Sequence, residues 1–102
     1  MIEEFQKLVD ERGQALRSKS RAELLGLQDC PTEWVEIDGS SGTIDLIVEE
    51  EPSGSLRIVV QGFLATKHFP RLGVKNVALD GFRIDSDEKL SELRYEEFYE
   101  FD

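Results

Sequence analysis

The side chains best suited to catalysis or metal binding are the single histidine, His68, and the single cysteine, Cys30. A catalytic histidine works beside a nucleophile and an orienting carboxylate, and a structural zinc ion needs several cysteines or histidines at close spacing. Neither pattern surrounds His68 or Cys30. A reactive thiolate is also favoured by nearby positive charge, yet Cys30 stands between Asp29 and Pro31. We therefore expect no catalytic residue, no bound metal and no cofactor, and we favour a protein that is not an enzyme.

Two further segments carry part of a ligand-binding pattern. Asp85–Glu88 is acidic, and Glu96 is the twelfth residue counted from Asp85, which is the spacing of a calcium-binding EF-hand loop. That loop requires an oxygen ligand at its fifth position and glycine at its sixth, where this chain has Lys89 and Leu90. Gly39–Thr43 lacks the lysine and the following helix of a phosphate-binding loop. Asp85–Glu88 and Gly39–Gly42 are therefore expected to be turns.

Four potential cations lie within nine residues of an otherwise acidic chain: Lys67, His68, Arg71 and Lys75. Clustered positive charge is typical of a site for an anionic ligand or for an acidic patch on a partner. The alternative is that these side chains form ion pairs with acids of the same protein. The cluster is a candidate anion- or ligand-binding site, and the sequence leaves both possibilities open.

Acidic and aromatic residues gather in two other places that are candidates for binding a partner. Aromatic side chains surrounded by charged ones are typical of docking surfaces. The alternative is that the tail aromatics pack on a sheet and that the acids only maintain solubility. The candidate residues are Glu49, Glu50, Glu51, Tyr95, Glu96, Glu97, Tyr99 and Glu100.

The charge of the chain restricts the class of partner. The net charge is −10, from 22 acidic and 12 basic residues. Residues 30–66 hold seven acids and one base, residues 67–84 hold one acid and four bases, and residues 85–102 hold eight acids and two bases. Nucleic-acid backbones are bound by clustered Lys and Arg, so we expect no nucleic acid as a partner.

Signals for membrane insertion or export are missing from the pattern of the chain. No apolar run approaches the roughly 18 residues of a membrane helix. The first residues are acidic and amphipathic, unlike the basic and then apolar pattern of a signal peptide. One cysteine cannot form an internal disulfide. We expect a cytoplasmic protein with no membrane partner.

The periodicity of apolar residues predicts two N-terminal helices. Ile2, Phe5, Leu8, Val9 and Leu16 recur at the spacing of one helical face, although glycine at position 13 weakens the last turns. A second helix begins at a predicted capping box, Ser20–Glu23, in which each side chain bonds the other's backbone amide. Gly26 is expected to end that helix in the left-handed conformation.

The rest of the chain alternates as strands do. The predicted strands are Glu33–Asp38, with Trp34 on the face opposite Val35 and Ile37, then Thr43–Glu51, Leu56–Leu64 and Lys75–Asp85. The hairpin from Thr43 to Leu64 is expected to bury Ile44, Leu46, Val48, Ile58 and Val60 on one face. A kink or bulge is predicted at Gly81, since Asp-Gly also favours a hairpin turn. Leu90–Phe101 is predicted to be a short helix.

Together these elements predict an α+β fold, with residues 1–102 as one domain. An N-terminal helix or helix pair packs on an antiparallel sheet of three to four strands, with a short C-terminal helix. Because no motif carries chemistry, our leading hypothesis is a non-enzymatic protein-binding module that offers an acidic face to a basic protein partner. The alternative is a small-molecule-binding or enzymatic domain with a pocket between sheet and helices. A homo-oligomer is compatible with either.

Overall fold

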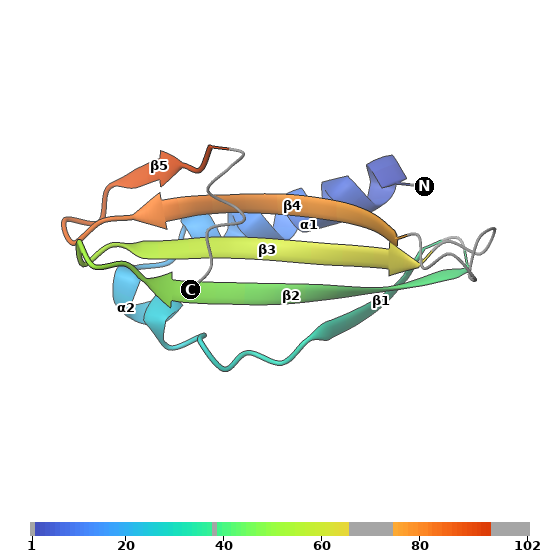
Figure 1. The fold of residues 1–102 in the computed structure, drawn as a ribbon, viewed down its shortest axis with the longest axis horizontal. Coiled ribbons are helices and arrows are strands. Elements are labelled where there is room, and N and C mark those ends of the chain that lie inside the picture. Colours follow the sequence, from blue (N-terminus) through green and yellow to red (C-terminus); the bar gives the residue numbers. More distant parts are fainter. Residues whose placement is uncertain (1, 38, 66–74, 95–102) are drawn as a thin grey trace.

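The chain forms a five-stranded antiparallel sheet with its helices on one face (Figure 1). The computed structural model describes residues 2–37, 39–65 and 75–94. In chain order the elements are α1 (Ile2–Arg17), α2 (Arg21–Leu25), β1 (Glu33–Ile37), β2 (Ser40–Glu50), β3 (Leu56–Ala65), β4 (Lys75–Ile84) and β5 (Leu90–Glu92). The strands lie in the order β1-β2-β3-β4-β5, because each pairs with the next along the chain. The predicted α+β class is therefore confirmed.

The predicted number of strands is wrong, because a fifth strand begins where a helix was expected. β5 pairs Leu90 with Ile84 and Glu92 with Phe82. The preceding turn reverses the chain at once, since one carboxylate oxygen of Asp85 accepts hydrogen bonds from two later backbone amides, each at 2.9 Å. Leu90–Glu92 is thus extended, and residues 95–101 of the predicted C-terminal helix lie outside the described residues.

Of the kink or bulge predicted at Gly81, the bulge is absent. β3 and β4 pair without an inserted residue through this point, with Val59 opposite Gly81 and Val60 opposite Asp80. The side chain of Arg17 donates to the Gly81 carbonyl oxygen at 3.0 Å and to the Asp80 carboxylate, so both residues are held from the helix side. Asp-Gly is a turn signal only where the chain is free to reverse.

The core lies between the sheet and the two helices, and the predicted hairpin forms its centre. Leu46 pairs with Val60 and Val48 with Ile58, so the predicted face is correct. Ile44, Ile58 and Val60 are buried, whereas Leu46 and Val48 are partly buried at its margin. Gly62 makes the close approach of α1 possible, because a Cβ there would stand 2.6 Å from the Phe5 ring.

The start of α2 is the one predicted by its capping box. The Ser20 hydroxyl accepts from the Glu23 amide at 3.2 Å, and the Glu23 carboxylate accepts from the Ser20 amide at 3.0 Å. The second bond lowers the pKa of Glu23, because it favours the charged carboxylate. The predicted left-handed end is wrong: Gly26 has a φ of −67°, and its amide continues the helical bonding to Ala22.

The end of α1 is fixed to the sheet by one largely buried arginine, Arg17. Arg17 bonds Asp80 of β4 and Glu92 of β5, each at 2.7 Å, and its guanidinium carbon lies 4.9 Å from the centre of the Phe82 ring. The hydrogen bond to Asp80 is the main cause that raises the pKa of Arg17. Asp80 fits because Gly13, one helical turn before Arg17, has no side chain: a Cβ at Gly13 would collide with the Asp80 carboxylate.

Gly13→Ala should therefore destabilise the protein, although alanine is the better helix former by about 1 kcal/mol. The added methyl must push Asp80 away from Arg17, and we expect a loss of about 1–3 kcal/mol, as for overpacked sites. Urea unfolding monitored by circular dichroism measures the change. The control is Gly26→Ala, where the nearest atom stands at an ordinary 3.4 Å and a gain of about 0.4–1 kcal/mol is expected. Stabilisation by both substitutions would contradict the proposed role of Gly13.

Candidate functional site

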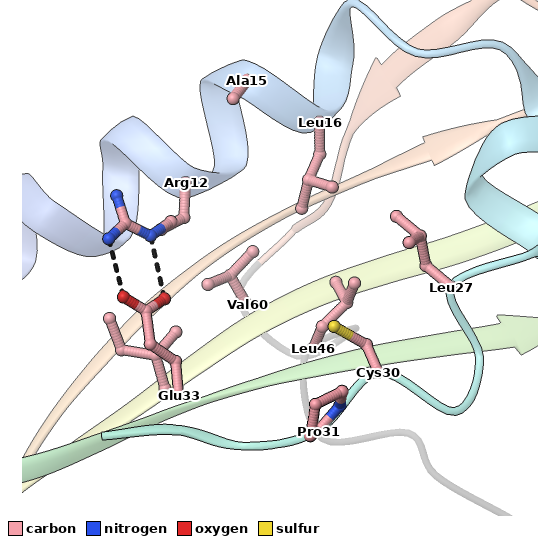
Figure 2. A pocket seen from close by; sticks show the side chains of 10 residues that line it. Arg12, Ala15, Leu16, Leu27, Cys30, Pro31, Glu33, Leu46 and Val60 are labelled. Carbon is pink, nitrogen blue, oxygen red and sulfur yellow. Dashed lines mark hydrogen bonds and ion pairs between the residues drawn. The ribbon is translucent and has the colours of Figure 1, made fainter. Parts of the chain in front are cut away.

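A cavity of about 220 Å³ opens between α1, the connection from α2 to β1, and the sheet (Figure 2). Its floor is formed by the buried side chains of Ile44 and Val60, with Leu16 and Leu46 beside them. The rim consists of Ala15, Leu27, Cys30 and Pro31. The lining is thus mainly apolar, and it comes from segments that are far apart in the sequence.

One ion pair forms the polar wall of this cavity. The Arg12 Nε atom lies 2.9 Å from Glu33 Oε1, and a terminal nitrogen lies 2.7 Å from Oε2, so both carboxylate oxygens are bound (Figure 2). The bond to Glu33 raises the pKa of Arg12, and the bond to Arg12 lowers the pKa of Glu33. Each charge is therefore satisfied by the other, and neither is adjusted for proton transfer near neutral pH.

The edge strand β1 is a second candidate site. On the face of the sheet away from α1, Trp34 is 77% exposed. Cross-strand pairing continues its row through Thr43 of β2, Phe63 of β3 and Val77 of β4. A shallow depression beside this row is lined by Trp34, Ser41, Gly42, Thr43, Phe63 and Ala65. Apart from Thr43, the side chains of this row on the second face of the sheet are apolar.

The two long edges of the sheet differ in how their backbone groups are used. Beyond β5, the carbonyl oxygens of Leu79 and Gly81 in β4 accept hydrogen bonds from the side chains of Gln6 and Arg17, each at 3.0 Å. No such bond reaches the outward backbone groups of β1 from any described residue. Every second residue of an edge strand directs its amide and carbonyl away from its neighbour. β1 therefore offers unpaired backbone groups next to an exposed tryptophan.

Of the predicted partner-binding acids, the structure describes three, and two of them are in ion pairs. Oε1 of Glu49 lies 2.9 Å from a terminal guanidinium nitrogen of Arg57, and Oε1 of Glu51 lies 2.5 Å from Nε of Arg83. Glu50 is exposed. The remaining candidates of this set, Tyr95, Glu96, Glu97, Tyr99 and Glu100, lie outside the described residues.

The predicted cation cluster is mostly outside the described residues as well. Lys67, His68 and Arg71 fall there, and Lys75 is described only as the first residue of β4, opposite Ala65. Among the described residues, no group of three or more His, Cys, Asp or Glu side chains is placed to hold a metal ion. No helix in the described ranges is long and apolar enough to cross a membrane.

The sequence predicted the correct face for Trp34 but did not identify it as a site. A pocket between sheet and helices was expected under the alternative hypothesis, but none of its lining residues was predicted. The signal for Trp34 was present, because strand alternation separates it from Val35 and Ile37. Arg12 and Glu33 gave no signal, since their contact depends on how α1 is positioned over β1. Comparison of the chain with known protein families, curated proteins and solved structures gives no match. The candidate sites therefore rest on their geometry.

The Arg12–Glu33 pair predicts a pH-dependent contribution to stability. Because the folded-state pKa of Glu33 is below its ordinary value of 4.5, the contribution is present above pH 4.5 and disappears as the pH falls through the lowered pKa. Both side chains are partly exposed, so Glu33→Gln should cost no more than about 1 kcal/mol at pH 7. Urea unfolding at pH 7 and pH 3 measures this cost.

The matched control is Glu36→Gln, which removes an exposed carboxylate from the same strand that makes no ion pair with a described residue. At pH 3 the Glu33→Gln substitution should cost less stability than at pH 7, because the contribution of the pair declines as the pH falls below 4.5. A cost of Glu33→Gln that is the same at both pH values would show that the ion pair is not its origin.

Proposed function

We propose that this protein is a non-enzymatic protein-binding domain that pairs its edge strand β1 with an extended, basic segment of a partner. The observation that carries the proposal is the exposure of Trp34 on that strand. A tryptophan buries a large apolar area when it is covered, and it is enriched among the residues that dominate binding energy. An exposed tryptophan on a sheet edge is therefore suited to a partner.

The backbone of β1 supports the same proposal. An extended peptide adds to an exposed sheet edge through main-chain hydrogen bonds, and alternate side chains then select the sequence. The five residues of β1 are within the usual length of such a strand. The edge of β4 is unsuited, because Gln6 and Arg17 already occupy carbonyl oxygens there.

Charge supports a basic partner over a second copy of this chain. Glu36 is exposed on the same face as Trp34, and residues 30–66 contain Arg57 as their only base. That arginine is bound to Glu49. Two copies with a net charge of −10 repel one another, whereas a basic segment is attracted and associates faster.

Edge strands also carry charged residues to prevent aggregation, and this alternative accounts for Glu33 and Glu36. It does not account for Trp34, because an exposed aromatic side chain favours association.

We also propose that the protein is cytoplasmic. Its only cysteine, Cys30, is exposed and cannot form an internal disulfide.

A peptide titration tests this function. The probe is a seven-residue peptide of alternating lysine and valine, and the comparison is the same peptide with glutamate in place of lysine. Trp34 is the only tryptophan, so its fluorescence reports binding, and amide NMR shifts locate the peptide. The lysine peptide should shift the NMR signals of the β1 amides, and its affinity should fall as salt is added. The glutamate peptide should not bind.

Trp34→Ala should lower the affinity for the lysine peptide at least tenfold, which corresponds to about 1.4 kcal/mol. Because this variant lacks the tryptophan, its binding is followed by the NMR shifts. The matched control is Val77→Ala, an exposed apolar residue on the same face but on β4, where a change below about twofold is expected. Equal binding of both peptides, or shifts away from β1, would refute the proposal. A Trp34-dependent dimer in sedimentation without peptide would instead assign the edge to a second copy.

A further inference from the structure

We infer that the cavity between α1 and the sheet is a binding site for a small, uncharged, apolar molecule. The site is separate from the β1 edge, because its lining lies on the face of the sheet that α1 covers. Glu33, which lines it, pairs with Ile44 on that face, whereas Trp34 pairs with Thr43 on the other. The inference therefore does not depend on the proposed protein-binding function.

The absence of charge on the ligand follows from the polar groups of the lining. Arg12 and Glu33 bind each other through two hydrogen bonds, at 2.9 and 2.7 Å. Figure 2 shows this pair at one side of the cavity, with the apolar side chains of Leu16, Leu46 and Val60 facing the space beside it. A charged ligand placed there would lose part of its hydration without gaining a free partner of opposite charge, which is unfavourable.

The size of the ligand follows from the volume. Drug-sized molecules occupy pockets of roughly 300–1,000 Å³, whereas this cavity measures about 220 Å³. A molecule with one ring, or a branched aliphatic chain of similar size, fits this description. Its apolar surface would replace water against Leu16, Leu46 and Val60, which is the favourable step.

The rim supplies a way to block the site without disturbing the core. Ala15 is exposed on α1 and lines the cavity. Ala15→Leu adds an apolar side chain at the rim, and leucine is nearly as good a helix former as alanine. The preceding residue, Gln14, is exposed and does not line the cavity. Gln14→Leu is therefore a matched control that adds the same side chain to the same helix.

The test is a methyl NMR titration of the full chain with toluene, benzoate and benzylamine, which share a ring and differ in charge. Toluene should shift the methyl groups of Leu16, Leu27 and Leu46 saturably, and the two charged probes should bind at least tenfold more weakly. Ala15→Leu should weaken toluene binding at least tenfold, and Gln14→Leu should change it by less than twofold.

Cys30 provides an independent readout, because it is the only cysteine, is exposed and lies at the rim with its sulfur turned toward the cavity (Figure 2). Toluene should slow its reaction with a thiol reagent in the unsubstituted protein and not in Ala15→Leu. Equal affinity for all three probes would overturn the inference that the ligand is uncharged. The location of the site would be refuted if toluene caused shifts that do not saturate or that lie in other methyl groups. Unchanged affinity of the Ala15→Leu variant for toluene would refute it as well. None of these results bears on peptide binding at β1.

Discussion

The guanidinium group of Arg17 joins the helical layer to the sheet, and the positions of the other elements depend on it. Its side chain is 12% exposed, and it bonds Asp80, the Gly81 carbonyl and Glu92 while lying over the Phe82 ring. An arginine provides five N–H donors in one plane, so a single side chain can bind two strands at once. Removing it would leave the largely buried carboxylate of Asp80 without its partner, which is more costly than never having formed the pair.

This attachment places α1 over β4 and β3 and away from β1 (Figure 1). Two consequences follow from the asymmetry. On the β4 side, Gln6 and Arg17 reach the strand and bind carbonyl oxygens that would otherwise lie unpaired at the edge. On the β1 side, the Arg12–Glu33 bridge joins the helix to the strand, and the cavity lies beside that bridge. The open edge and the cavity therefore have a common origin.

The sequence predicted the elements whose determinants are local. The capping box at Ser20 and the alternation that places Leu46 opposite Val60 both act within a few residues or across one hairpin. It failed where a distant contact decides the outcome. Leu90–Phe101 has the apolar spacing of a short helix, yet its first residues form β5. Asp85 reverses the chain before them, and Arg17, which is distant in the sequence, holds Glu92. Gly13 looked like a weak point of α1, whereas its missing side chain is what admits Asp80.

The candidate sites were less predictable than the fold, because counting charges does not show which of them are free. The sequence predicts Glu49 and Glu51 as part of a patch for a partner, yet Glu49 binds Arg57 of β3 and Glu51 binds Arg83 of β4. Such a pair is locally neutral, so it contributes little to the field that a distant basic partner experiences. Glu36 is exposed and outside any ion pair with a described residue. The charge best placed to attract a basic segment is therefore beside Trp34, at the edge where unpaired backbone groups are available to receive it.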